Sequence, residues 1–268
     1  MHRVVSSGRS RGVRRDANAI SLPALYSVKP VSSTRQFRAA LRLRYEVFNV
    51  ELQEGLQSSH STGYDFDRFD AVVDHIIVSC AYTNRVVGTY RLQTGEMAAR
   101  NLGYYSEREF DFSPYEPLRS RVLELGRACI HQEHRNTQVL MLLWKAIVKY
   151  GIERGCRYLL GCSSLTSQDA AIGAAVYGKL KNFLVRPELQ TRPQPALECG
   201  LETASDEANV PKLLRAYLTV GAQICGPPAL DAEFGTIDFL TLLDLAELPN
   251  GFFARVMQPQ GELAYHGA

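Results

Sequence analysis

Leu123-Glu124-Leu125-Gly126-Arg127-Ala128-Cys129-Ile130-His131 is a mainly apolar segment that carries two opposite charges. Its pattern predicts a buried β-strand. Glu133-His134-Arg135-Asn136-Thr137 follows, and apolar residues then recur at helical spacing as far as Gly155, which predicts a long helix. A strand with an inward-facing Glu and Arg, next to an open helix N-terminus, indicates a site where a charged acceptor meets a phosphate-bearing donor.

Glu124 and Arg127 would face opposite sides of a regular strand, because side chains alternate along it. A bulge near Gly126 would bring both to one side. A buried Glu with a raised pKa can accept a proton from an amine. The alternative is a structural ion pair, in which the two residues only satisfy other groups.

The start of the long helix is the second candidate site. Asn136 or Thr137 is a suitable cap, and the amides that follow it have no partner within the helix. Free amides and the helix dipole attract phosphate, and Arg135 adds a full positive charge. An ordinary capped helix without a ligand is the alternative.

A third candidate is the acidic run Tyr64-Asp65-Phe66-Asp67-Arg68-Phe69-Asp70, followed by Asp74-His75. Its carboxylates can hold an aminated substrate, or they can form a solvated loop. Arg44 falls on the apolar face of its helix, where it either faces a site or extends to water. Arg91 ends a strand and faces either a site or solvent. No metal site is expected, because His131 and His134 straddle a turn and no ligand set has a typical spacing.

Composition fits one large domain: the chain has 268 residues, of which 46% are apolar, and a net charge of +2. This balance does not suggest a nucleic-acid-binding protein. The six cysteines are scattered without a C-x-x-C pair, so free thiols and a cytoplasmic location are expected. We expect no signal peptide and no membrane-spanning helix.

The first 22 residues carry five arginines against one acidic residue, Asp16. This segment is polar and aperiodic, which predicts a disordered tail. A solvated leader is the simpler interpretation, and an arm that contacts anionic lipid is the alternative. We assign residues 1–30 to this basic tail, residues 31–257 to a single domain and residues 258–268 to a C-terminal tail.

The remaining pattern predicts an α+β fold. Strands are expected at residues 25–29, 71–80, 85–92, 121–131, 157–162 and 236–244. Helices are expected at 33–51, 137–155, 167–181 and 211–219, with a short one near 106–110. Antiparallel strands followed by strand–helix–strand connections predict one central sheet flanked by helices.

These motifs together resemble the GNAT-like N-acyltransferases that use acyl carrier protein, and in particular the bacterial ornithine N-acyltransferases, sometimes labelled hemolysin-like. Acyl-homoserine-lactone synthases share the skeleton. The resemblance covers residues 33–257 and rests on an ordered set of motifs. They are Arg44-x-x-x-Phe48, Asp67-Arg68-Phe69-Asp70 with Asp74-His75, Val87-Gly88-Thr89-Tyr90-Arg91-Leu92, Leu123-Glu124-Leu125-Gly126-Arg127, Gly161-Cys162-Ser163-Ser164, Tyr217-Leu218-x-x-Gly221-Ala222 and Phe234-Gly235-Thr236-x-Asp238-Phe239.

The resemblance implies a GNAT-like (acyl-CoA N-acyltransferase) fold with a mixed central sheet, and a site with a role for each motif. Catalysis would fall to Glu124, which accepts the proton of the amine, and to Arg127. The acceptor would be bound by Arg44, Asp67, Asp70 and Arg91. The acyl-phosphopantetheine donor would be bound by Cys129, Ile130, His131, Arg135, Asn136, Thr137 and Gln138. No bound cofactor and no metal are implied, since the acyl-phosphopantetheine is a co-substrate.

One departure from common GNAT acetyltransferases bears on the donor. Their Gly-rich turn is missing here, where Gln138 and Leu140 stand at the matching positions. The missing turn fits acyl carrier protein better than acetyl-CoA as the donor, because the phosphopantetheine of the carrier has only one phosphate to bind. Such a carrier is acidic, and the candidate docking charges are Arg119, Arg121, Arg135, Lys179 and Lys181.

The resemblance therefore implies transfer of a 3-hydroxy fatty acyl group from acyl carrier protein to the α-amine of L-ornithine, the first step of ornithine lipid synthesis. The enzyme would be cytoplasmic and peripheral to the inner membrane. The alternatives are an N-acyltransferase for another amino acid, or an acyl-homoserine-lactone synthase, although the Trp expected after the Arg44-x-x-x-Phe48 motif is absent. An alternative of another class is a non-catalytic, membrane-active protein.

Overall fold

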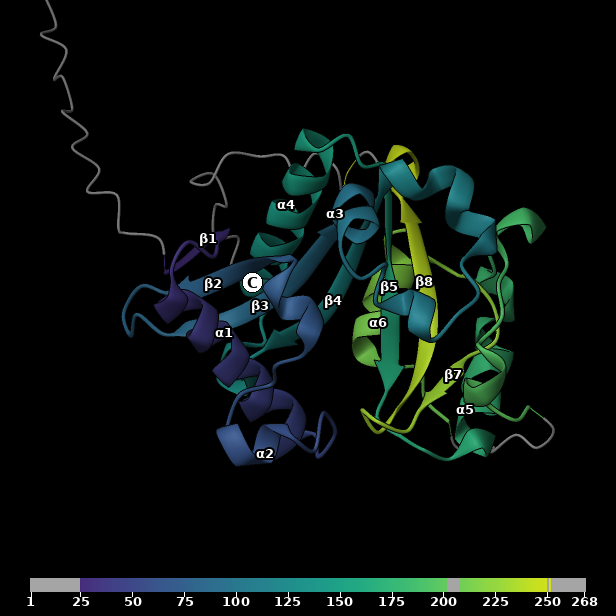
Figure 1. Ribbon diagram of the computed structural model, residues 1–268, viewed down its shortest axis with the longest axis horizontal. Helices are drawn as coiled ribbons and strands as arrows, with labels where there is room; N and C mark the ends of the chain where they lie inside the picture. The colour runs from purple at the N-terminus through teal and green to yellow at the C-terminus, as the bar shows by residue number, and fades with distance from the viewer. Residues whose placement is uncertain (1–24, 202–207, 250, 252–268) are drawn as a thin grey trace, which may run out of the picture.

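The computed structural model of the chain describes residues 25–201, 208–249 and 251, and these form a mixed sheet with helices on both faces (Figure 1). The strands follow the order β1-β2-β3-β4-β5-β8-β6, and β7 pairs with β8. Only β4 and β5 run parallel to each other. The α+β architecture expected from the sequence is confirmed.

The strands are β1 (Tyr26–Pro30), β2 (Asp74–Cys80), β3 (Val86–Thr94), β4 (Val122–Ile130), β5 (Tyr158–Leu165), β6 (Gln223–Ile224), β7 (Ala229–Asp231) and β8 (Thr236–Asp244). The helices are α1 (Thr34–Tyr45), α2 (Ser59–Thr62), α3 (Gly95–Arg100), α4 (Thr137–Glu153), α5 (Ala170–Leu180) and α6 (Lys212–Thr219). A π-helical turn, Glu46–Glu51, extends α1.

Helices α1 and α4 cover opposite faces of the β2–β3–β4 part of the sheet (Figure 1). Helix α4 presents Val139, Leu143 and Ile147 at helical spacing, and these side chains pack on the apolar residues of β2 and β3. Helix α5 packs against β8 in a separate apolar cluster.

Strands β4 and β5 separate soon after they meet, and this creates the main opening in the sheet (Figure 1). Their register covers only Val122↔Tyr158, Leu123↔Leu159 and Glu124↔Leu160, although β4 continues to Ile130 and β5 to Leu165. Gly161 stands at the point of separation, where an added Cβ would lie 2.2 Å from the carbonyl oxygen of Leu125. Only glycine fits this close approach of two backbones.

The structure departs from the sequence predictions at four places. Residues 26–30 form β1 and pair with β2, which confirms the strand expected at residues 25–29 and places these residues in the sheet and not in the basic tail to which they were assigned. The segments 53–63 and 93–105, where the sequence predicted no helix, contain α2 and α3. Strands β6 and β7 were not predicted, because they are only two and three residues long. The remainder of both predicted tails lies outside the described residues.

The six cysteines are free, as expected. None of the helices in the described part of the chain is both long and apolar enough to cross a membrane.

Candidate active site

The separation of β4 and β5 opens into a cavity of about 240 Å³. Its walls come from β3, β4, β5 and β8, with α4 and α6 closing one end. Polar and charged side chains gather at one end, including Arg91, Glu124 and Arg127. Apolar side chains line the other, including Trp144, Leu213 and Leu243.

A bulge in β4 brings Glu124 and Arg127 into this cavity. Thr89 pairs with Cys129 and Arg91 pairs with Gly126, so Tyr90 alone faces two residues of β4. Arg127 adopts a left-handed conformation with φ of 50°. The extra residue shifts the alternation of side chains, which confirms the bulge predicted near Gly126.

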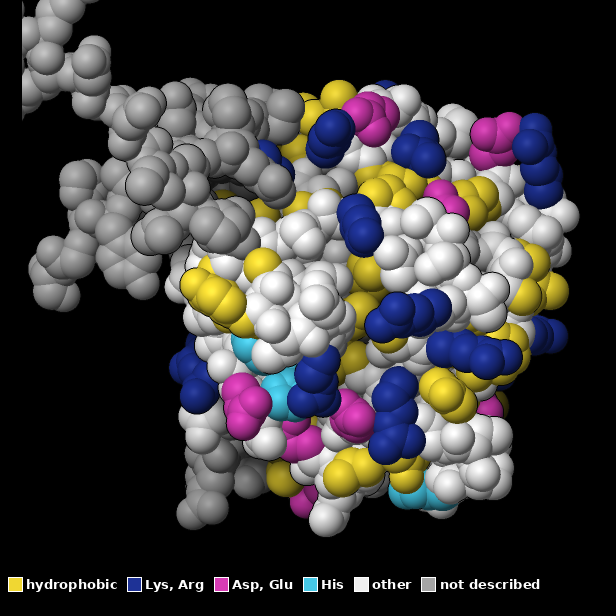
Figure 2. Space-filling model, turned by 90° about the vertical axis from the view of Figure 1, so that its left-hand side faces the viewer, with side chains coloured by type: hydrophobic (Ala, Val, Ile, Leu, Met, Phe, Trp, Pro, Cys, Tyr) yellow, Lys and Arg dark blue, Asp and Glu magenta, His cyan; other side chains and the backbone are white. Residues whose placement is uncertain are grey.

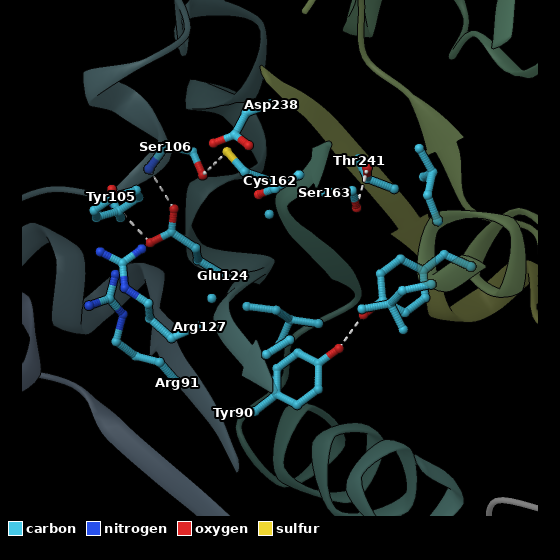
Figure 3. Close-up of a pocket in the computed structure, with 18 of the residues that line it drawn as sticks. Tyr90, Arg91, Tyr105, Ser106, Glu124, Arg127, Cys162, Ser163, Asp238 and Thr241 are labelled. Atoms are coloured by element: carbon cyan, nitrogen blue, oxygen red, sulfur yellow. Dashed lines mark hydrogen bonds between the residues drawn. The ribbon is translucent and has the colours of Figure 1, made fainter. Parts of the chain in front are cut away.

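Glu124 is 4% exposed and is held by two backbone amides. The N–H groups of Tyr105 and Ser106 donate to its two oxygens, each at 2.8 Å (Figure 3). Burial raises the pKa of Glu124 although these hydrogen bonds act in the opposite direction. Each carboxylate oxygen keeps a second lone pair, so the group can still accept a proton from a ligand in the cavity.

Three arginines and three aspartates form a buried network beside Glu124. Arg44 donates to Asp65 at 2.7 Å and to Asp70 at 2.6 and 3.1 Å. Arg91 Nη1 donates to both oxygens of Asp67, at 2.9 and 2.7 Å. Arg127 Nη2 donates to Asp67 at 3.1 Å, and its Nε lies 3.3 Å from Asp65. With three charges of each sign, the network is neutral.

The network fixes the ionisation of its carboxylates. Burial by itself would raise the pKa of Asp70, but the Arg44 guanidinium outweighs it and holds that pKa well below its ordinary value. Burial would likewise raise the pKa of Asp67, but Arg91 and Arg127 outweigh it and lower that pKa. These aspartates are therefore permanent counter-ions of the arginines.

Of the residues expected to bind the acceptor, only Arg91 lines the cavity. Arg44, Asp67 and Asp70 lie behind its wall. Asp67 pairs with Arg91 and Arg127, and Asp70 pairs with Arg44 and lies 3.5 Å from Arg91. Asp74, the fourth carboxylate of the acidic run, is separate and accepts from the Tyr150 hydroxyl at 2.6 Å. Arg91 Nη2 and Arg127 Nη1 have no hydrogen-bond partner among the described residues, so they remain available to an anion.

Sequence reasoning missed a group of carboxyls on the opposite wall. Glu54, Asp231 and Asp238 line the cavity, and Glu109 lies next to Asp238. A signal for Asp238 was present, because a charged residue in the middle of an apolar strand is unusual. Glu54 and Glu109 lie in irregular segments, where the sequence offers no pattern to reveal burial.

The predicted donor end lies where β4 leads into α4. The Asn136 side chain caps the helix by accepting from Val139 N–H at 3.0 Å. The N–H groups of Thr137 and Gln138 have no partner among the described residues. Arg135 is paired with Glu51 through two bonds of 2.5 and 2.7 Å, so its charge is partly neutralised.

The other donor residues lie at the end of β4. The His131 N–H donates to the Val87 carbonyl at 2.9 Å and is therefore occupied in the sheet. The Ile130 carbonyl accepts from Arg135 Nε at 3.0 Å. The Cys129 side chain is buried on the α1 side of the sheet, so this side chain does not face a donor.

Two of the predicted docking charges are distant from this end. Arg119 and Arg121 precede β4, whereas the donor end follows it, and a strand of nine residues separates them by roughly 30 Å. Arg119 is also paired with Glu116 and Glu107. Helix α1 exposes Arg35, Arg38 and Arg42, and Figure 2, which faces the side with β1 and α1, shows Lys and Arg side chains gathered there.

Two groups in the described part of the chain bring potential metal ligands within 4.8 Å of one another. His131, Glu133 and His134 form the first, at the partly exposed turn before α4. Glu109, Cys162 and Asp238 form the second, beside the cavity. Burial raises the pKa of the Cys162 thiol well above its ordinary value, so this thiol is neutral in the free protein.

Comparison with known proteins agrees with the fold and the motifs. A family model described as an acetyltransferase (GNAT) domain matches residues 43–145. The L-ornithine N(alpha)-acyltransferase of Rhodobacter capsulatus is 29% identical over 256 residues, which cover 89% of this chain and 98% of that protein. The protein of the same name from Brucella abortus is 28% identical over 244 residues, covering 85% and 87%. The expected resemblance to ornithine N-acyltransferases is confirmed.

Solved structures with the same fold include two acyl-homoserine lactone synthases. BjaI, solved with SAM and isopentyl-CoA, superposes with a TM-score of 0.53 at 14% identity, covering 88% of this chain and 92% of that chain. LasI superposes with a TM-score of 0.51 at 10% identity, covering 87% and 94%. The chain therefore has a GNAT-like fold, as predicted.

Proposed function

We propose that the chain is an N-acyltransferase that moves a 3-hydroxy fatty acyl group from acyl carrier protein to the α-amine of L-ornithine, the first step of ornithine lipid synthesis. The observation that carries the proposal is a single cavity that joins a buried carboxyl, Glu124, to an apolar arm. The relatives named L-ornithine N(alpha)-acyltransferase, which match nearly the whole chain, support ornithine as the acceptor.

The apolar arm suits a fatty acyl chain. Trp144 of α4, Leu213 and Tyr217 of α6 and Leu243 of β8 line it. The Tyr217 hydroxyl is hydrogen-bonded to that of Tyr90 across the opening between β4 and β5, which ties α6 to β3. Burial of methylene groups contributes about 0.8 kcal/mol each, so a long chain gains much of its binding energy here.

The donor thioester enters where β4 leads into α4. One phosphate of the phosphopantetheine binds the free amides of Thr137 and Gln138 at the positive end of the helix dipole. The arm then extends along β4, and the amide of Ile130, which points away from β3, is the candidate to stabilise the thioester oxygen as it becomes negative, whereas the Cys129 amide points toward β3. His131 lies beside the donor but offers it no backbone amide, since the His131 N–H already donates to the Val87 carbonyl. The co-substrate leaves after each turnover, and no resident cofactor takes part.

The acceptor carboxylate binds the free nitrogens of Arg91 and Arg127, because arginine suits carboxylates. Glu124 takes a proton from the α-ammonium, directly or through a water molecule. The amine nitrogen then attacks the thioester carbon, the C–N bond forms and the C–S bond breaks. The departing thiolate takes the second proton of the nitrogen, and Glu124 releases the first to solvent. No acyl-enzyme is formed.

The test is an assay by mass spectrometry with L-ornithine and 3-hydroxyacyl carrier protein, with 3-hydroxyacyl-CoA as a parallel donor. Formation of the N-acyl ornithine supports the proposal, and a preference for the carrier protein supports the donor. Acylation of another amino acid, or of S-adenosylmethionine, would replace the acceptor assignment. A protein that acylates nothing but lyses vesicles would be membrane-active instead. Removing residues 1–24 and measuring binding to anionic vesicles tests peripheral membrane association.

A further inference from the structure

Four carboxyls on the wall opposite the arginines form what we call the acidic cluster: Glu54, Glu109, Asp231 and Asp238. They are 8%, 3%, 9% and 4% exposed, respectively. No Lys, Arg or His among the described residues forms an ion pair with any of them. The arginines of the cavity are already matched by the aspartates of the network. The acidic cluster therefore has no cation of its own.

Two oxygens of the acidic cluster point to a missing partner. Glu109 Oε1 and Asp238 Oδ1 are fully shielded from solvent and have no hydrogen-bond donor among the described residues. Burying an unpaired polar group costs several kcal/mol, and an unpaired ion costs more. In the free protein a shared proton offsets this cost, because burial and the neighbouring carboxyl raise the pKa of Glu109 and burial raises that of Asp238.

The acidic cluster is connected to the catalytic carboxyl through Ser106. The Ser106 N–H donates to Glu124 at 2.8 Å, and its hydroxyl lies 3.5 Å from the Cys162 sulfur, which in turn lies 3.3 Å from Glu109. Figure 3 shows Asp238 and Cys162 on one side of Glu124 and Arg91 and Arg127 on the other. A ligand that reaches Asp238 and the arginines together must pass Glu124.

We propose that the acidic cluster binds the side-chain ammonium of the acceptor, so that the enzyme selects an amino acid with a second amine. This inference rests on the proposed function and deepens it. An ammonium has three N–H donors, which match the carboxyls of Asp238, Asp231 and Glu54 on the same wall. The α-carboxylate lies at the arginines and the α-amine between the two groups, at Glu124. Asp67 and Asp70 cannot fill this role, because they lie behind the cavity wall.

The experiment compares L-ornithine with L-norvaline, which has the same carbon chain and no side-chain amine. We expect kcat/KM to favour ornithine by a factor on the order of 10² or more, because norvaline leaves the buried carboxyls unpaired. Asp238→Asn should lower this ratio at least about tenfold, mainly through KM for ornithine. Glu233→Gln, an exposed carboxyl close to Asp231 in the chain, is the matched control and should leave the ratio unchanged.

A direct binding measurement separates failure of this inference from failure of the proposed function. Calorimetry without donor should show that ornithine binds at least about tenfold more tightly than norvaline. Equal binding, or an unchanged ratio in Asp238→Asn, overturns the acidic cluster as the ammonium site. If Asp238→Asn does not fold, Glu54→Gln, in the same wall of the cavity, replaces it. Stoichiometric zinc in the purified protein would assign the cluster to a metal. Tight, selective ornithine binding without acylation would overturn only the proposed function.

Discussion

Glu124 and Arg127 face one cavity although they lie three residues apart on β4, because Arg127 adopts φ of 50° in a bulge. The Arg127 guanidinium lies 4.3 Å from the centre of the Phe234 ring and within reach of Asp65 and Asp67. These contacts hold a residue in a conformation that costs on the order of 1 kcal/mol or more. The bulge therefore sets the distance between the Glu124 carboxylate and the Arg127 guanidinium.

Replacing Glu124 tests the base. Glu124→Gln should reduce kcat by a factor on the order of 10²–10⁴, because the amide cannot accept the proton. One of the two backbone donors loses its partner, so the free energy of unfolding should fall by about 1–3 kcal/mol with the fold retained. Steady-state kinetics and circular dichroism measure both effects. Glu107→Gln, outside the cavity, is the control, and near-normal turnover in Glu124→Gln would exclude Glu124 as the base.

The geometry of the Arg127 guanidinium should matter more than its charge. Arg127→Lys keeps the charge but loses the planar group that contacts Asp65, Asp67 and the Phe234 ring. We expect KM for the acceptor to rise at least about tenfold, since a lysine cannot bind a carboxylate through two nitrogens. Arg108→Lys, an exposed arginine paired with Glu233, is the control. An unchanged KM would place the acceptor carboxylate elsewhere.

The buried ion network should dominate stability in acid. The pKa of Asp70 is lowered from 3.8, so its contribution is complete above about pH 4 and is lost as the pH falls further. Asp70→Asn should destabilise the protein by about 3 kcal/mol or more at pH 7, because Arg44 is 0% exposed and loses a charged partner. Denaturant unfolding measures this. Asp74→Asn, whose partner is Tyr150, should change stability by no more than about 0.5 kcal/mol.

Glu54 should produce the opposite pH dependence. Burial raises its pKa from 4.5 to about 7, so between these values the native state retains a proton that the unfolded chain has lost. Stability must then fall as the pH rises through this window. Glu54→Gln removes the ionisation and should be more stable than the parent at pH 8, by up to about 3 kcal/mol, and equal to it near pH 4. If unfolding curves give the same difference in stability between Glu54→Gln and the parent at pH 8 and at pH 4, the raised pKa of Glu54 is contradicted.

Gly161 should control the opening between β4 and β5. In Gly161→Ala the new Cβ would meet the Leu125 carbonyl at 2.2 Å, so the strands must move. We expect a loss of about 1–3 kcal/mol in stability, together with a lower kcat/KM. Gly178→Ala is the control: this exposed helical glycine has no heavy atom within 4 Å of an added Cβ, and the change should stabilise α5 by up to about 1 kcal/mol. A fully active Gly161→Ala would show that β4 and β5 can move apart at this contact without loss of activity.

The sequence by itself determined the local structure at the centre of the site. Alternating and helical apolar patterns gave β4, α4 and β8 close to their observed bounds, and the two charges in β4 indicated the bulge. These features depend on neighbouring residues, whose preferences are visible in the order of the chain. The motifs also predicted Glu124, Arg91 and Arg127 as site residues, and all three line the cavity.

Only the tertiary structure decided which charges meet. Arg44 and Asp70 lie behind the cavity wall, whereas Glu54 and Asp238, far apart in the chain, lie on it. Whether a charge is buried and paired depends on how segments that are far apart in the chain pack together. No local pattern in a single sequence shows which of these segments will meet. Packing of the segments around Glu54 and Glu109 against β5 and β8 places unpaired carboxyls in the same cavity wall region as Glu124. That arrangement is the physical basis for the proposed selection of an acceptor with two amines.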